Sequence, residues 1–115
     1  MMTKEGRRQM LQDMAQRARH IAVFDGIPNA GGVEITNRDQ RLQVEWRIGE
    51  TAILNNAELV FRRLRAGRVT HAGFYTADGT LIRVIPLGKP VILNGGSDDL
   101  LRLKEGQLSI QLIEP

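Results

Sequence analysis

The C-terminal part of the chain alternates apolar and polar positions in the way typical of β-strands joined by tight turns. An alternating run over residues 69–75 leads into the polar segment 77–80, and an apolar run over residues 81–85 follows. An Asp-Gly pair between two such runs is a strong hairpin signal, because the central turn positions need positive φ angles. The pattern therefore predicts a hairpin with its turn at Asp78-Gly79.

A second strand-and-turn unit is predicted after this hairpin. It consists of an apolar strand at Lys89–Leu93, a turn at Asn94–Ser97 and a closing strand over residues 105–112. Asparagine and glycine dominate the turn, as is usual where a chain reverses its direction. The C-terminal part of the chain is thus predicted to consist of strands and turns alone.

Side chains of the closing strand should point alternately into and out of the core. Successive residues of a strand face opposite sides, so Leu108, Ile110 and Leu112 share one face. Ser109 and Gln111 share the other face. We predict that the three apolar side chains are buried and that the two polar side chains are exposed.

The N-terminal segment, about Lys4–Ala18, has the periodicity of an amphipathic helix rather than of a strand. Its apolar residues recur at helical spacing and form one stripe: Met10, Leu11, Met14, Ala15 and Ala18. Methionine side chains are flexible and polarisable, so two of them make this stripe adaptable. Two interpretations stay open: the helix packs on its own sheet, which we favour, or it docks on a neighbouring subunit.

Between the helix and the hairpin, the pattern predicts three more strands. A short buried strand covers residues 21–24, and an alternating strand with a charged outer face covers residues 42–48. A third strand is predicted at 57–61, and the segment 29–39, which contains glycine and asparagine, is predicted to be a loop. The middle of the chain therefore continues the β pattern of its C-terminal part.

Together these elements predict a mainly β fold. We expect a compact antiparallel β-sandwich or barrel of about seven or eight short strands with one N-terminal α-helix. A length of 115 residues suits a single domain with one modest core. Residues 1–19 should form the helix, on or beside the sheet, and residues 20–115 the β domain.

The composition removes several classes of protein and site. The chain has no cysteine, so neither disulfide bonds nor thiolate metal sites are available. No apolar run approaches the ~20 residues that span a bilayer, and the N-terminus has the pattern of a charged helix rather than of a signal peptide. We therefore expect no membrane partner and assembly in a cytoplasm.

One short basic stretch is the candidate partner-binding site: Arg62, Arg63, Arg65 and Arg68. Along an extended segment, Arg63 and Arg65 would point to one side and Arg62 to the other. Proteins that bind single-stranded nucleic acid usually place aromatic side chains among such arginines, and this stretch has none. Because arginine also forms planar, bidentate contacts with carboxylates, we expect acidic groups of another protein as partners, rather than nucleic acid.

No catalytic, metal-binding or cofactor-binding set of residues emerges from the sequence. His71 lies within a predicted strand without the spacing of a metal site, so we interpret it as structural. Asp98-Asp99 lacks the alternating acids of a calcium loop and is predicted to cap the loop before the next strand. The glycines fall at turns and not at the start of a helix, which argues against a phosphate-binding loop. We therefore predict a protein that is not an enzyme and has no cofactor.

Several short motifs between Arg19 and Leu112 follow one another in a definite order. In chain order they are Val33–Thr36, Arg41–Val44, Val69–Phe74, Lys89–Val91 and Glu105–Ile110. Their order and spacing resemble the small tail-fibre-like virion structural proteins of tailed bacteriophages. The strand that begins Val69-Thr70-His71 and the ending Gly106–Ile110 are the most specific parts of this resemblance.

The resemblance implies a non-enzymatic structural protein on the outer surface of a virion, assembled in the cytoplasm of the host bacterium. Its partners would be other virion proteins and further copies of itself, and a trimer is the favoured homo-oligomer. Assembly of identical copies also covers the strand edges of a small β domain. Two alternatives stay open: a capsid decoration or cement protein, and a β module that binds nucleic acid or carbohydrate. For stacking on sugars the chain offers only Trp46 and Tyr75.

Overall fold

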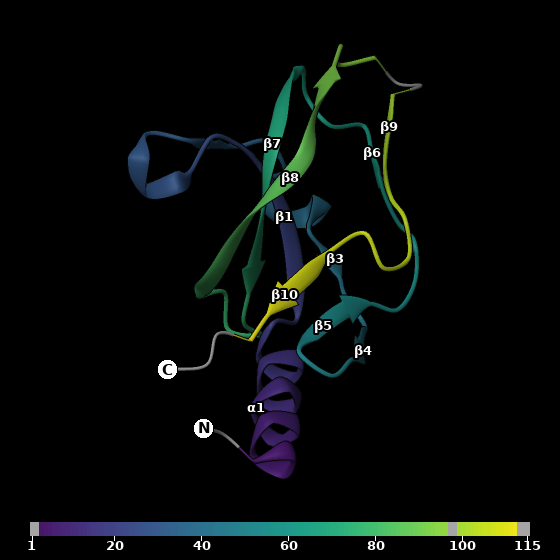
Figure 1. The fold of residues 1–115 in the computed structure, drawn as a ribbon. Helices are drawn as coiled ribbons and strands as arrows, with labels where there is room; N and C mark the ends of the chain where they lie inside the picture. The colour runs from purple at the N-terminus through teal and green to yellow at the C-terminus, as the bar shows by residue number, and fades with distance from the viewer. Residues whose placement is uncertain (1–2, 97–98, 113–115) are drawn as a thin grey trace.

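The computed structural model describes residues 3–96 and 99–112 (Figure 1). In this part of the chain one α-helix is followed by ten short β-strands, and all the strand pairings are antiparallel. The protein is therefore mainly β with one N-terminal helix, which confirms the predicted fold class. The elements are α1 (Lys4–Arg17), β1 (His20–Asp25), η1 (Pro28–Ala30), β2 (Val33–Glu34), η2 (Arg38–Gln40), β3 (Leu42–Gln43), β4 (Trp46–Ile48), β5 (Ala52–Asn55), β6 (Leu59–Arg62), β7 (Gly67–Tyr75), β8 (Leu81–Leu93), β9 (Leu100–Leu103) and β10 (Ser109–Gln111), where η marks a short 3₁₀ helix.

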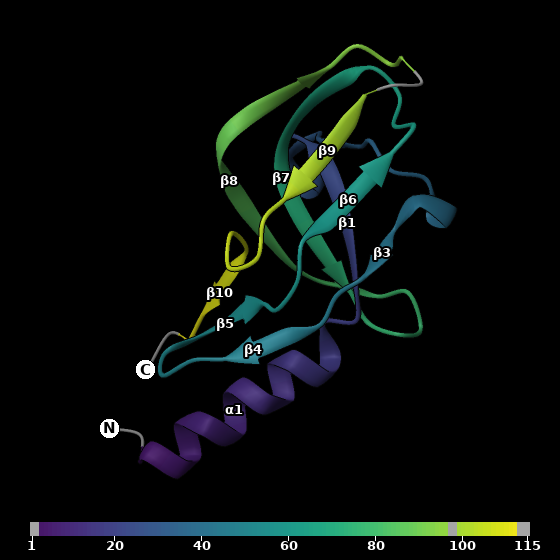
Figure 2. The same ribbon diagram turned by 90° about the vertical axis from the view of Figure 1, so that its right-hand side faces the viewer.

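The strands form three antiparallel sheets around one core (Figure 2). The largest sheet has the strand order β2-β1-β7-β8, and β3 also pairs with β1. The second sheet has the order β10-β5-β4, and the third consists of β6 and β9. Strands β8 and β10 are edge strands of different sheets and do not pair with each other. The barrel is therefore not closed, and the arrangement is closer to a sandwich.

The core draws side chains from the helix and from all three sheets. Its largest fully buried members include Leu11 of α1, Phe74 of β7, Ile53 of β5 and Phe61 of β6. Ile110 of β10 is only 2% exposed. Burial of such side chains contributes roughly 1.5–3 kcal/mol each to folding. One apolar core therefore holds the three sheets and the helix together.

Helix α1 begins and ends close to the predicted bounds and packs on its own sheet. The hydroxyl of Thr3 accepts a hydrogen bond from the Gly6 backbone N–H at 3.0 Å, which caps the first turn. The helix packs against β4 and β5, and Leu11 and Ala18 are buried. Met10, at the edge of the same stripe, is 44% exposed. The apolar stripe is thus only partly covered by the chain itself.

The predicted hairpin turn is confirmed. It joins β7 to β8 at Asp78-Gly79, and Gly79 has a φ of 92°. The Gly79 N–H donates to the carbonyl of Thr76 at 3.0 Å, and the Thr76 N–H donates to the carbonyl of Thr80 at 2.8 Å. Glycine adopts this φ without the steric penalty that a Cβ would bring. The sequence signal was strong here because the turn is purely local.

The strands predicted at 81–85 and 89–93 are one strand in the structure, β8, which pairs with β7 along its length. Its register jumps from Val69↔Val91 to His71↔Pro86, so residues 87–90 form a bulge opposite a single residue of β7. Pro86 precedes this bulge, and Pro90 is its last residue. Proline has no N–H to give to a sheet and is confined to edges and bulges, which explains why one continuous strand reads as two in the sequence.

The single strand predicted at 42–48 is wrong in its extent. The structure divides it into β3, which pairs with β1, and β4, which pairs with β5. The chain passes from one sheet to the other between them, and the Val44 N–H donates to the carbonyl of Arg19 at 3.0 Å. Ile48, expected on the buried face, is 37% exposed. Apolar and polar residues alternate without interruption across this passage between sheets, so the sequence pattern gave no sign of it.

Three strands were not predicted, and they raise the number from the expected seven or eight to ten in the described residues. Strand β2 lies in the segment 29–39, which was predicted to be a loop, and it pairs with β1. Strand β5 pairs on one side with β4 and on the other with β10. Strand β9 pairs with β6, and the third sheet consists of this pair alone. The closing strand is correspondingly shorter than the predicted 105–112, because its first residues form the turn after β9. The predicted turn Asn94–Ser97 lies partly outside the described residues.

The inward and outward faces of the closing strand are as predicted. Leu108 and Ile110 are buried, and Gln111 is exposed. Leu112 is partly buried and packs against the core. Ser109 is half-buried, because it faces the gap between the sheets rather than open solvent. The two-residue period was therefore a sound guide to this strand.

A buried asparagine ties β5 to the turn before β10. Asn55 is 0% exposed. Its side-chain amide donates to the carbonyls of Ala57 at 2.9 Å and Lys104 at 2.8 Å. Its side-chain oxygen accepts from the Leu108 N–H at 2.9 Å. All three hydrogen bonds of this buried side chain are therefore made with backbone groups of neighbouring segments.

Candidate functional site

The basic stretch predicted to bind a partner lies on the connection between β6 and β7. All four arginines are exposed. Arg63 and Arg65 line one surface depression of about 440 Å³, to which Glu34, Gln40 and Gly95 also contribute. Arg62 ends β6 and Arg68 lies in β7, and neither lines the depression. The structure thus brings Arg63 and Arg65 together and leaves the other two arginines outside their depression.

The backbone of Arg63 is held in an unusual conformation. Its φ is 58°, and it is the one non-glycine residue with positive φ in the described part of the chain. Such a conformation costs roughly 1–2 kcal/mol for a residue with a side chain. The carbonyl of Arg63 accepts a hydrogen bond from the side-chain amide of Gln40 at 2.9 Å, and the next residue, Leu64, is buried. This arrangement buries Leu64 while its arginine neighbours stay at the surface.

Arg65 is attached to the edge of the largest sheet. Its guanidinium group donates a hydrogen bond to the backbone carbonyl of Glu34 in β2. The side chains of Arg62 and Arg68 make no hydrogen bond or ion pair with any described residue. The depression therefore offers one positioned guanidinium group, Arg65, and one projecting from a strained backbone, Arg63. A carboxylate is the natural partner of such a pair.

A second cluster, which the sequence did not reveal, lies around the carboxylate of Glu34. Arg41 donates from Nε to Glu34 Oε2 at 3.0 Å and from its terminal nitrogen to Oε1 at 2.8 Å. Thr36 donates to Oε2 at 2.6 Å, and the Tyr75 hydroxyl donates to Oε1 at 3.2 Å. The Arg41 guanidinium also stacks on the Tyr75 ring, 3.9 Å from its centroid. The cluster connects β2, the segment before β3 and the end of β7.

The charge states within this cluster are fixed at neutral pH. Burial acts to raise the pKa of Glu34, but hydrogen bonds from Arg41 and Thr36 and the charge of Arg41 outweigh it, so the pKa is lowered. The hydrogen bond to Glu34 raises the pKa of Arg41. Burial, followed by the charge of Glu34, raises the pKa of Tyr75. A general acid or base works best with a pKa near the operating pH. All three pKa values are shifted away from neutral pH, so we interpret the cluster as a structural link between strands.

Trp46 and Tyr75, the two rings available for stacking on sugars, both make contacts within the fold. The Trp46 indole N–H donates to the carbonyl of Ala18 at 2.8 Å. Its ring packs on Phe74 with centroids 5.2 Å apart and planes tilted by 58°. Tyr75 is stacked under Arg41. A carbohydrate site would therefore have to compete with these contacts.

His71 and Asp99 have local hydrogen-bonding partners. His71 Nδ1 lies 2.8 Å from the hydroxyl of Thr70, within β7. The carboxylate of Asp99 accepts from the N–H groups of Asn94 at 2.7 Å and Gly95 at 3.1 Å, and so caps the loop as predicted. Asp98, the other half of that prediction, lies outside the described residues. Asp99 thus supports the backbone of its loop, and the His71 ring contacts the side chain of its neighbour.

The described residues contain neither a cluster of metal ligands nor a membrane-spanning helix. Within residues 3–96 and 99–112, no group of three or more histidine, aspartate or glutamate side chains could hold a metal ion. The same residues contain no helix that is long and apolar enough to cross a bilayer. Comparisons with known proteins gave no match either: no protein-family model, no curated protein and no solved structure matches this chain.

Proposed function

We propose that this chain is a non-enzymatic structural protein of a tailed-phage virion. In this proposal it lies on the outer surface of the particle, in a tail-fibre-like or tail-associated position, and assembles as identical copies. The observation that carries the proposal is the pair Arg63 and Arg65, presented at one surface depression by a strained backbone. Strained residues persist where the surrounding structure enforces them, and they cluster at functional sites. The order of the sequence motifs resembles that of tail-fibre-like virion proteins, so we expect the partner at this surface to be another virion protein.

The exposed strand edges support assembly in several copies. Strand β8 pairs only with β7 and strand β10 only with β5 among the described strands. Ile92, near the end of β8, is 68% exposed. Open edges and exposed apolar side chains are usually covered by a neighbouring chain. Symmetric homo-oligomers, of which we favour a trimer, would cover the stretch of β8 around Ile92 with the fewest kinds of contact.

Particle incorporation tests the proposed role of the two arginines. In a complementation assay with the phage that encodes the chain, we expect Arg63→Glu combined with Arg65→Glu to abolish incorporation. The isolated domain should stay folded, because both side chains are at the surface. A matched control combines Arg47→Glu with Arg102→Glu, which changes the charge equally at two exposed ion pairs of 3.4 Å on other strands. Such exposed pairs contribute about 0–1 kcal/mol, so the control should enter particles normally.

The same particles distinguish the remaining alternatives. Recovery of the protein with isolated tails supports the tail position, whereas recovery with isolated heads identifies a capsid decoration or cement protein. Absence of the wild-type protein from purified particles contradicts the proposal in all its forms. Gel-shift titrations over a range of salt concentrations test nucleic acid, because binding to phosphates weakens steeply as salt rises. Tight DNA binding by the wild type at physiological salt would replace the virion proposal with the nucleic-acid alternative.

A further inference from the structure

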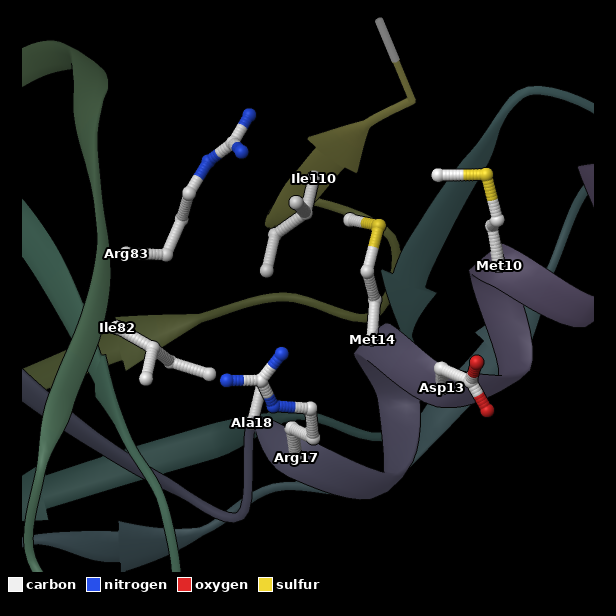
Figure 3. Close-up of a pocket in the computed structure, with 8 residues that line it drawn as sticks. All are labelled: Met10, Asp13, Met14, Arg17, Ala18, Ile82, Arg83 and Ile110. Atoms are coloured by element: carbon white, nitrogen blue, oxygen red, sulfur yellow. The ribbon is translucent and has the colours of Figure 1, made fainter.

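A cavity of about 340 Å³ opens between α1 and the two unclosed strand edges, β8 and β10. Figure 3 shows Met14 of α1, Ile82 of β8 and Ile110 of β10 around this cavity. Met10 lies at its outer end and is 44% exposed. The cavity lies away from the depression formed by Arg63 and Arg65, and the two share no lining residue.

The apolar wall suits a single apolar side chain. The cavity is at the lower end of the size range of about 300–1,000 Å³ found for ligand pockets. Methionine is the most adaptable apolar residue and recurs at surfaces that accept varied partners. Met10 and Met14 provide one wall, and the branched side chains of Ile82 and Ile110 provide the other. A leucine or methionine side chain of a partner would bury apolar surface on both sides.

Two arginines with no partner in the described chain stand at the rim. Arg17 ends α1 and Arg83 lies in β8, and both line the cavity (Figure 3). The side chain of neither arginine makes a hydrogen bond or an ion pair with a described residue. The nearby Asp13 accepts a hydrogen bond from the side-chain amide of Gln9 at 3.3 Å. The two arginines would therefore attract carboxylates of a partner that flank an apolar side chain inserted into the cavity.

The occupant should be an extended segment. A second cavity of about 360 Å³ continues along the same gap between β8 and β10, and Arg83 lines both cavities. Over Leu81–Ile85, strand β8 pairs with β7 on one side, and its outer side pairs with no described strand. Pro86 ends this free stretch because it has no N–H. Side chains two residues apart on an added strand point in the same direction. Two apolar side chains of such a strand would therefore enter the two cavities in turn.

We propose that this gap binds an extended acidic segment of a partner protein, with apolar side chains in the cavities and carboxylates at Arg17 and Arg83. Charge complementarity at this gap favours an acidic segment of a different protein over a second copy of this basic chain, because Arg17 and Arg83 both line the cavity. The mode is the addition of a short strand to an exposed sheet edge, in which backbone hydrogen bonds give affinity and pockets give specificity. The proposal concerns a different surface from Arg63 and Arg65 and does not depend on the virion role.

Methionine methyl groups report directly on this site. The chain has four methionines, two of which, Met10 and Met14, line the cavity. The full chain, labelled with ¹³C at the methionine methyl groups, is titrated with the peptide acetyl-Glu-Leu-Glu-Leu-Glu-amide, and Met10→Leu and Met14→Leu assign the two signals. We expect both signals to shift saturably. The matched peptide acetyl-Lys-Leu-Lys-Leu-Lys-amide, with the same leucines, should shift neither.

Paired variants separate the effect of the rim arginines from a general effect of net charge. Arg17→Glu with Arg83→Glu should weaken binding of the acidic peptide at least about tenfold, since reversing two rim charges removes on the order of 1.4 kcal/mol or more. Arg47→Glu with Arg102→Glu, an equal change in charge at two exposed ion pairs that line neither cavity, should leave the affinity unchanged. Circular dichroism and dispersed methyl signals confirm that each variant is folded.

Four results would overturn the proposal. These are equal binding of the lysine peptide, no methyl shift at millimolar acidic peptide, an affinity unchanged by the Arg17 and Arg83 substitutions, and movement of the same methyl signals on simple dilution. The last result would identify a second copy as the occupant. None of these results bears on particle incorporation, so the virion role and this binding site succeed or fail separately.

Discussion

Replacing Asn55 with alanine tests how this open set of sheets is held together. The amide of Asn55 makes three hydrogen bonds to backbone groups of Ala57, Lys104 and Leu108, at 2.8–2.9 Å, in a place with no exposed surface. Alanine removes all three bonds and leaves one N–H and two carbonyls without this partner. Each such bond contributes about 1 kcal/mol net, so we expect a loss of roughly 3 kcal/mol. This loss is a large share of the ~5–15 kcal/mol that stabilises a domain.

Urea and thermal unfolding followed by circular dichroism measure this loss. For a chain of this size each kcal/mol shifts the melting temperature by about 4 °C, so Asn55→Ala should melt roughly 12 °C below the wild type. The neighbouring Asn56→Ala is the matched control. Asn56 is exposed, and the hydrogen bond from its backbone N–H to the carbonyl of Glu45, at 2.8 Å, survives the substitution. The control should stay within about 0.5 kcal/mol of the wild type.

A third variant distinguishes lost hydrogen bonds from a small loss of packing. Asn55→Asp keeps an oxygen that can accept from the Leu108 N–H, but it places a second oxygen against the carbonyls of Ala57 and Lys104. Repulsion between a buried carboxylate and two carbonyl oxygens should make this variant less stable than Asn55→Ala at neutral pH. If Asn55→Ala melts within 2–3 °C of the wild type, or if Asn55→Asp is as stable as the wild type, the amide does not tie these segments together.

Three further predictions concern the core, the hairpin and acid stability. Ile110→Asp should unfold the domain, since an unpaired buried carboxylate costs several kcal/mol, and a dispersed NMR spectrum of that variant would contradict its placement in the core. Gly79→Val should cost about 1–3 kcal/mol in urea unfolding through its positive φ, whereas Ala77→Val, in the same turn region, should have a much smaller effect. The lowered pKa of Glu34 means that its stabilising contribution is present above its ordinary value of 4.5 and is lost as pH falls through the lower value of the folded state. The unfolding free energy of the wild type should therefore fall more steeply on acidification than that of Glu34→Gln, and parallel curves would refute this role.

Local signals in the sequence were sufficient for much of the fold. The helix, the hairpin turn and the faces of the closing strand each depend on residues close together in the chain, and each is found in the structure. Strand β5 depends on partners far away: Ile53 lies opposite Ile48 on one side and Ile110 on the other. The buried Asn55 also interrupts its apolar pattern. Its strand character therefore comes from pairing, which no local window contains.

The sites were predictable to a smaller extent. The arginine stretch was visible in the sequence as a concentration of charge, but the φ of Arg63 was not, because positive φ is usually signalled by glycine, asparagine or aspartate. The Glu34 cluster joins residues 7 and 41 positions apart, and a strand arginine gives no sign of which carboxylate it will meet. The cavity beside Met10 and Met14 depends on which strand edges stay unpaired, and this is a property of the sheet order alone.

The two prolines at the bulge of β8 limit edge-to-edge association when many copies of the domain lie close together. A virion surface or any other repeated array holds identical domains at high local concentration, where a long, flat strand edge would let chains stack on one another without limit. Pro86 and Pro90 divide the open edge of β8 into two short stretches on either side of a kinked segment. Neither stretch is long enough to start a growing fibre. The edge can therefore receive one brief extended segment and still remain safe beside many copies of itself.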